Sequence, residues 1–303
     1  MRIFLAGATG VAGRALVLLL VAGGHQVSGV GRTPEKRAAL TAAGAVPVVV
    51  DLFSASDVRA AVAGHEVVIN LATHIPSTSR MALPGAWDET ARLRSEASVN
   101  LVDAALAAGA QRYIQESLAL AYPDCGAEWI DESTPLDLPK HVRSVGDAEA
   151  AAQRFAAGGT GVILRFAAFY GPESGQTRAT LAAIRRGIAA MPGPPEGYVS
   201  SIAIVDAAAA VVAALQLDAG VYNVADEPLT RQEFHEAIAA ALGVRPPRSL
   251  PSTKALLGPA GGMLARSLRV SSRKLRQASG WTPRYPSVRE GWRAVVEQLG
   301  DAA

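Results

Sequence analysis

Three glycines at three-residue spacing follow a short apolar run at the start of the chain. The run Arg-Ile-Phe-Leu-Ala leads into Gly7-Ala-Thr-Gly10-Val-Ala-Gly13 and then into an apolar stretch through Leu20. Because glycine has no Cβ, a turn of this kind between a strand and a helix brings backbone N–H groups close to a phosphate. The positive end of the helix faces the same anion. The pattern therefore predicts a phosphate-binding turn and indicates a nucleotide ligand.

Apolar runs and helical stretches alternate from the N-terminus to residue 166. Strands buried on both faces read as continuous apolar runs, and repeated strand-helix-strand units build a doubly wound parallel sheet. The fold class is therefore predicted to be α/β, with a Rossmann-type sheet. Strands are expected at residues 2–6, 26–30, 46–50, 66–71, 112–115 and 162–166. Helices are expected at residues 11–22, 34–43, 55–63, 86–108 and 143–156.

The rest of the chain keeps this alternation only in part. The predicted organisation is a nucleotide-binding Rossmann-type domain of residues 1–170, to which residues 201–226 return, and a smaller, mainly helical lobe of residues 171–303. The later elements expected are a strand at 201–205, a helix from 206, a strand at 220–224 and a helix from 230.

The composition argues against several classes of partner. With a formal net charge of +2 and no block of Lys and Arg, the chain lacks the electrostatic footprint of a nucleic-acid or acidic-membrane binder. Cys125 is the single cysteine, which excludes an internal disulfide framework and fits a reducing cytoplasm. The apolar residues 16–21 are too few to span a bilayer, and no His, Cys and carboxylate cluster has metal-ligand spacing. We expect a cytoplasmic protein without nucleic-acid, membrane or metal partners.

Several motifs occur in order over nearly the whole chain, at residues 7–13, 51–52, 70–73, 164–172, 205–206, 221–225 and 280–283. Together they resemble the extended short-chain dehydrogenase/reductases, in the epimerase/dehydratase branch. The resemblance implies a C-terminal lobe that closes a substrate cleft over the nicotinamide of a bound cofactor.

The end of the second predicted strand indicates which dinucleotide binds. An acidic residue there holds the ribose 2′-hydroxyl of NAD, whereas an arginine accommodates the 2′-phosphate of NADP. This chain has Gly31-Arg32, with Lys36 and Arg37 in the following turn and helix. The arginine fork can pair with the phosphate, so NADP is the favoured cofactor. A plain solvated helix start remains the alternative for Arg32.

The resemblance also assigns further cofactor contacts at the strand ends. Asp51 is expected at the adenine, although it is also a candidate N-cap of the next helix. Phe166 stands where the family often has proline, beside the nicotinamide. The full set of expected cofactor residues is Gly7, Thr9, Gly10, Val11, Ala12, Gly13, Arg32, Asp51, Leu52, Leu71, Ala72, Thr73, Ser117, Phe166, Ala167, Ala168 and Phe169.

The family's catalytic triad is missing. Relatives use a serine, a tyrosine and a lysine four residues after the tyrosine, and the tyrosine gives a proton to the carbonyl oxygen as hydride arrives. Here the serine aligns with Leu118, the tyrosine with His141 and the lysine with Val145. No Tyr-x-x-x-Lys occurs anywhere in the chain. Any reduction must therefore find its proton elsewhere.

Four residues are candidates for stabilising or protonating the acceptor: Ser95, Ser117, Tyr122 and His141. Three of them also have a structural explanation, namely a strand-end cap for Ser117, packing for Tyr122 and a surface or capping role for His141. Glu116 alternates with Ser117 along a strand, so it is expected to face away from the site.

These observations predict an NADPH-dependent reductase that acts on a ketone of a secondary metabolite, an aromatic polyketide being one candidate. The chain resembles the triad-less ketoreductases that tailor angucyclinones. Its expected partner is a flat, hydrophobic small molecule, which the apolar segment 256–263 is placed to cover if it is not ordinary core. The alternatives are a non-catalytic NADP(H) sensor and a sugar-nucleotide epimerase or dehydratase. The oligomeric state is left open.

Overall fold

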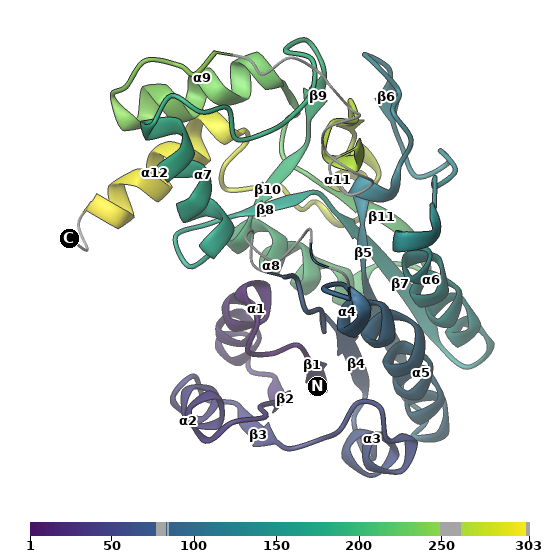
Figure 1. Cartoon of the computed structure of the whole chain (residues 1–303). Helices are drawn as coiled ribbons and strands as arrows, with labels where there is room; N and C mark the ends of the chain where they lie inside the picture. Colours follow the sequence, from purple (N-terminus) through teal and green to yellow (C-terminus); the bar gives the residue numbers. More distant parts are fainter. Residues whose placement is uncertain (77–82, 84, 249–261, 301–303) are drawn as a thin grey trace.

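The computed structural model describes residues 1–76, 83, 85–248 and 262–300. Seven parallel strands form one sheet in the order β11-β7-β5-β4-β1-β2-β3 (Figure 1). The reversal of order beside β1 is the arrangement of a doubly wound sheet, as predicted. The strands are β1 (Arg2–Ala6), β2 (Gln26–Val30), β3 (Val46–Val48), β4 (Val67–Asn70), β5 (Arg112–Leu118), β7 (Thr160–Phe166) and β11 (Gly220–Val224).

Both faces of this sheet are buried, which explains why its strands read as continuous apolar runs. On β1, Ile3 and Leu5 belong to one hydrophobic cluster, whereas Phe4 and Ala6 belong to another. The first cluster packs under α1 (Val11–Ala22) and α8 (Ile204–Ala213), with α2 (Pro34–Ala42) nearby in Figure 1. The helices over the second cluster are α3 (Ala55–Val62), α5 (Ser98–Ala107) and α6 (Ser144–Arg154).

Several predicted bounds differ from the structure by one to three residues; the strand expected at 112–115, for example, extends to Leu118, and one helix is divided. The helix expected over 86–108 is divided into α4 (Asp88–Arg92), a π-helical turn η1 (Leu93–Ala97) and α5. The strand expected over 201–205 ends at Ala203, because α8 begins at Ile204. An apolar helix start of this kind has the same composition as a buried strand, so residue pattern alone does not place the boundary.

The C-terminal part adds a second helical layer, at the upper left of Figure 1. It contains α7 (Gly175–Arg185), α9 (Arg231–Leu242) and α12 (Val288–Gly300), which share a hydrophobic cluster. Tyr170 stacks on Trp292 there, with ring centroids 5.4 Å apart. The segment from α11 (Arg273–Ser279) to α12 is held against α8, because the Asp206 carboxylate accepts hydrogen bonds from the backbone N–H groups of Arg284 and Tyr285.

Short elements complete the chain. They are η2 (Ala119–Ala121), β6 (Trp129–Ile130), η3 (Lys140–Val142), η4 (Phe155–Ala157), β8 (Ala168–Tyr170), β9 (Tyr198–Val199), β10 (Ser201–Ala203), η5 (Ala214–Gln216), β12 (Leu229–Thr230), β13 (Arg269–Val270) and α11 (Arg273–Ser279). Of the apolar segment 256–263 proposed as a substrate cover, residues 256–261 lie outside the described residues.

Acid is expected to destabilise the lobe through His235 on α9. This side chain is buried, and its Nε2 accepts a hydrogen bond from the backbone N–H of Met191. Burial, with the nearby Arg231 charge, lowers the pKa of His235 from 6.5 to about 4. The unfolded chain therefore takes up this proton first as pH falls, and stability decreases by about 3 kcal/mol between roughly pH 6.5 and pH 4.

Urea unfolding across this pH range measures the effect. The His235→Gln variant keeps an acceptor for Met191 but has no ring to protonate, so its stability should fall less with acid than that of the wild type. Parallel losses in the two proteins would show that His235 is not responsible.

Candidate functional site

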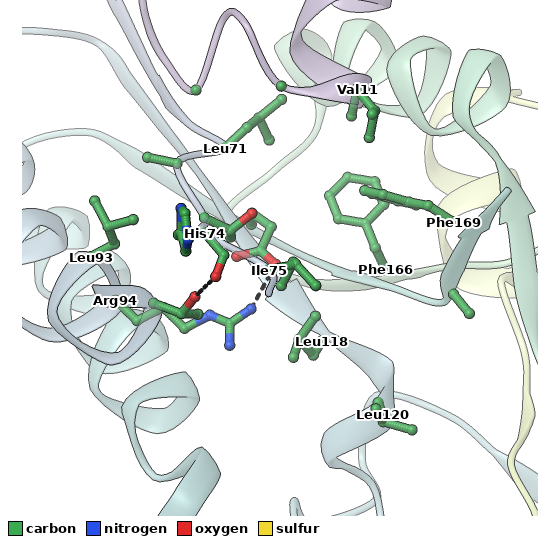
Figure 2. A pocket seen from close by; sticks show the side chains of 18 of the residues that line it. Val11, Leu71, His74, Ile75, Leu93, Arg94, Leu118, Leu120, Phe166 and Phe169 are labelled. Atoms are coloured by element: carbon green, nitrogen blue, oxygen red, sulfur yellow. Dashed lines mark hydrogen bonds and ion pairs between the residues drawn. The ribbon is translucent and has the colours of Figure 1, made fainter. Parts of the chain in front are cut away.

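A large cleft opens at the carboxyl ends of the parallel strands, between the sheet and the C-terminal layer. Its volume is about 1350 Å³, and its walls are mostly apolar. The segments that follow β1, β2, β4, β5 and β7 all contribute to it, as the crevice at a topological switch point requires. Figure 2 shows side chains from these segments, Leu71, Leu118 and Phe166 among them, converging on one space.

The glycine turn forms one end of the cleft. Gly7 has a φ of +82°, and a Cβ there would lie 2.4 Å from the Leu71 carbonyl oxygen. A Cβ on Gly13 would lie 2.1 Å from the Gly7 carbonyl oxygen. The turn closes with a hydrogen bond of 3.0 Å from the Gly10 N–H to the same oxygen. Only glycine allows this approach of the loop to helix α1.

The start of α1 is built to receive an anion. Its N-cap is Gly10, in extended conformation, and no side chain caps the N–H groups of the first turn. Gly10, Val11 and Ala12 line the cleft, so the N-terminus of the helix opens onto it. A pyrophosphate fits this position, since the free N–H groups and the helix dipole both favour negative charge.

The predicted cofactor residues gather along this cleft. All of them line it except Ser117: Gly7, Thr9, Gly10, Val11, Ala12, Gly13, Arg32, Asp51, Leu52, Leu71, Ala72, Thr73, Phe166, Ala167, Ala168 and Phe169. Phe166 and Phe169 meet edge to face, with ring centroids 5.3 Å apart. The set therefore forms one continuous surface from the glycine turn to the end of β7.

Two cations line the end of the cleft that follows β2. Arg32 and Lys36 both reach it, and Arg32 forms an exposed ion pair of 3.4 Å with Glu89 of α4. Glu89 also lies 3.5 Å from the His74 ring. Exposed pairs of this kind contribute about 0–1 kcal/mol, so a phosphate can replace Glu89 as the partner of Arg32.

The alternative N-cap role for Asp51 is wrong. Helix α3 begins at Ala55, and its cap is Ser54, whose hydroxyl accepts a hydrogen bond from the Asp57 N–H. Asp51 instead accepts from the Phe53 N–H at 2.9 Å, forming an Asx turn that leaves it at the cleft.

The two faces of β5 are the reverse of the expectation. Glu116 and Leu118 line the cleft, whereas Ser117 points to the other side and donates to the Glu149 carboxylate at 2.5 Å. Alternation along the strand was expected, but it places Glu116 rather than Ser117 at the site. The catalytic and cofactor roles predicted for Ser117 therefore lack a geometric basis.

Tyr122 is also buried away from the cleft. Its hydroxyl donates to Asn223 at 2.8 Å and accepts from Arg165 at 2.8 Å, and Arg165 in turn forms two hydrogen bonds with Glu149. Burial raises the pKa of Tyr122. The phenol of Tyr122 is fully enclosed, and its hydroxyl already donates one hydrogen bond and accepts another. This geometry fits the packing explanation and gives the hydroxyl no access to a substrate in the cleft.

The other two catalytic candidates are Ser95 and His141. Ser95 donates to the Ala91 carbonyl oxygen at 2.9 Å within its own helical segment and is not a lining residue. His141 lies in η3 at the rim, where Val142 and Ser144 line the cleft. Val145, at the position of the family lysine, is completely buried.

Sequence reasoning missed a buried ion pair in the cleft wall. Arg94 of η1 donates to Glu116 of β5 at 3.1 Å, and both residues line the cleft. Glu116 was detectable, because it stands two residues before Leu118 and so shares its face of the strand. Nothing in the local pattern singled out Arg94.

Among the described residues, no group of three or more His, Cys, Asp or Glu side chains is placed to hold a metal ion. In the same part of the chain, no helix is long and apolar enough to cross a membrane.

Comparison with solved structures supports the fold. The human epimerase family protein SDR39U1 with NADPH superposes with a TM-score of 0.83 at 24% identity, covering 99% of this chain and 100% of that one. A UDP-glucose 4-epimerase from Thermotoga maritima gives 0.82 at 19% identity, covering 100% and 99%. MoeE5 in complex with UDP-glucuronic acid and NAD gives 0.79 at 22% identity, covering both chains completely.

Sequence similarity identifies the family of the chain. A curated Streptomyces protein, 3-diazoavenalumate denitrifying reductase, is 36% identical over 309 residues, which cover 96% of this chain and 99% of that protein. The family model described as NAD(P)H-binding matches residues 7–218. This range contains the glycine turn and every strand of the large sheet apart from β1 and β11. The chain therefore belongs to the NAD(P)H-binding family.

Proposed function

We propose that this protein is an NADPH-dependent reductase that delivers hydride to a flat, hydrophobic small molecule without an acid from the family triad. The observation that carries the proposal is one cleft whose lining joins the glycine turn to an apolar region. The sequence has no family triad to serve that region. When bound, NADPH supplies the hydride. The chain's own residues hold the dinucleotide and shape the apolar space. The reductase among its relatives supports this class of reaction.

NADPH rather than NADH is proposed because of the cations after β2. Arg32 and Lys36 line the cleft, and Gly31 leaves no carboxylate at the position that would repel a 2′-phosphate. A Cβ on Gly31 would lie 3.1 Å from Leu40 and 3.2 Å from Arg37, so close packing also favours glycine there.

Replacing Arg32 with alanine should weaken NADPH binding about 10- to 100-fold, the value of one or two charge-assisted hydrogen bonds. NADH affinity should change little, because NADH has no 2′-phosphate. Titration calorimetry with both cofactors measures the difference. Arg59→Ala removes the same charge at an exposed position of helix α3 and serves as the control. Equal losses for NADPH and NADH would contradict the assignment.

The missing acid favours an acceptor that needs no proton. Hydride transfer to an aromatic diazonium ion forms a C–H bond, breaks the C–N bond and releases N₂, so ArN₂⁺ and NADPH give ArH, N₂ and NADP⁺. Charge and atoms balance without a proton. A diazo group is also what the name of the 36% identical relative specifies. We therefore propose an aromatic diazo compound as the first acceptor class.

A ketone, such as one in an aromatic polyketide, is the second acceptor class. Its reduction places negative charge on oxygen, which needs a donor within reach. Ser144, at the start of α6, lines the cleft, and this hydroxyl-bearing residue is the observation that favours this class. A phenolic hydroxyl of the substrate itself is another source of the proton.

Incubating the protein with NADPH and a panel of arenediazonium salts, polycyclic ketones and quinones tests the proposal. NADPH oxidation above the protein-free rate, with the denitrified arene as product, is expected. Turnover of ketones alone would select the second class. Tight NADPH binding without turnover of any acceptor would contradict a reductase and favour the NADP(H) sensor.

A further inference from the structure

We infer that Glu116 determines acceptor specificity: its carboxylate, held by Arg94, is the counter-charge for a cationic acceptor in the apolar part of the cleft. This inference rests on the proposed function and identifies a residue that selects the diazonium class over neutral ketones.

The Arg94–Glu116 pair is buried and yet belongs to the cleft wall. The two side chains are 4% and 9% exposed, and both line the cleft. In Figure 2 the dashed line from Arg94 marks this pair, with Leu93, Ile75 and Leu118 around it. Burial of two charges is costly unless their hydrogen bonds are satisfied, so a pair retained at this position calls for an explanation.

The pairing is incomplete, in contrast with the other buried Arg–Glu pair. Arg165 binds Glu149 through Nε and Nη2, each at 2.8 Å. Arg94 binds Glu116 through Nη2 alone, and its buried Nε has no hydrogen-bond partner. Within the described residues, the Glu116 carboxylate accepts only this one hydrogen bond. Arg94 therefore holds the carboxylate without saturating it, which leaves acceptor capacity for a ligand.

The local backbone places this pair. Arg94 lies in the π-helical turn η1, between α4 and α5, and π-helical turns are frequent at functional sites. Glu116 lies on β5, on the same face as Leu118. Leu118 is the residue that the family resemblance aligns with the catalytic serine. The carboxylate therefore stands next to the position of the reacting group.

The carboxylate lies in a largely apolar part of the cleft. Leu93, Leu118, Ile75 and Phe166 line the same cleft, so a charge there is weakly screened by its surroundings apart from Arg94. A negative charge there opposes the oxyanion of a ketone reduction and attracts a diazonium ion. The lack of a family triad in the sequence and the presence of this carboxylate thus favour the same acceptor.

The test compares two unreactive ligands of equal shape, an aryl trimethylammonium ion and its neutral tert-butyl analogue, binding to the NADPH-saturated protein. The wild type should bind the cation about tenfold more tightly, or better, and Glu116→Gln should remove this preference while affinity for the neutral ligand stays within about twofold. Glu96→Gln is the control, because Glu96 lies in η1, the turn that carries Arg94, but is exposed and outside the cleft lining.

Because Glu116→Gln leaves Arg94 without its partner, thermal melting is recorded for every variant. The double variant Arg94→Met, Glu116→Leu replaces the whole pair with apolar residues and should also bind both ligands equally. No preference for the cation in the wild type, or equal losses for both ligands in Glu116→Gln, would overturn the inference. Since binding is measured without turnover, a failed reductase assay is distinguishable from a failed role for Glu116.

Discussion

Replacing Gly13 with alanine is expected to abolish NADPH binding at cofactor concentrations that saturate the wild type. The new Cβ would stand 2.1 Å from the Gly7 carbonyl oxygen and 2.9 Å from Ala8, both backbone positions that cannot move independently. The glycine turn must then shift away from α1, which separates the N–H groups that would hold the pyrophosphate. Fluorescence titration with NADPH measures the loss.

The control for this variant is Gly300→Ala. It makes the same chemical change at the end of α12, where an added Cβ meets nothing within 4 Å. NADPH affinity should be unchanged there. If Gly13→Ala binds NADPH as the wild type does, the pyrophosphate does not lie at the start of α1 and the orientation of the cofactor would have to be revised.

Replacing Arg165 with methionine is expected to lower the free energy of unfolding by about 3–5 kcal/mol, the usual cost of leaving a buried charge unpaired. The residue left behind is Glu149, whose side chain is 7% exposed and which also accepts from Ser117. Urea unfolding measures the loss. The double variant Arg165→Met, Glu149→Leu removes both charges and should recover much of the stability.

A different outcome would change the role of this network. If Arg165→Met unfolds at the same urea concentration as the wild type, the Arg165–Glu149 ion pair adds no more stability than the packing of the methionine side chain. If the double variant is no more stable than the single one, the loss comes from Tyr122 and its neighbours instead of the unpaired carboxylate.

Much of the fold was predictable because burial on both faces leaves a clear signature. The strands at 2–6 and 26–30 and the helix at 11–22 have the predicted bounds, since each is a mainly apolar segment that borders a glycine-containing turn. The helix expected at 86–108 was not predictable in detail. The π-helical turn η1 inserts its extra residue inside a sequence that favours helix throughout, and helix propensity does not distinguish the two.

The nucleotide end of the cleft was also predictable, because it depends on backbone approach and glycine marks the positions where that occurs. The acceptor end was not. Alternation along β5 separates Ser117 from Glu116 but does not say which faces the cleft, and a buried network that holds Ser117 and Tyr122 has no local signature. Arg94 joins Glu116 only through the packing of η1 against the sheet, which is a tertiary contact.

The most direct test of the central claim follows the hydride. The protein is given an arenediazonium salt in ordinary water with NADPH carrying deuterium at either face of nicotinamide C4. One of the two labelled cofactors should deliver deuterium to the ring carbon that lost N₂, with no hydrogen taken from water. A product whose new hydrogen comes from solvent with both labelled cofactors would contradict hydride transfer without a protein acid.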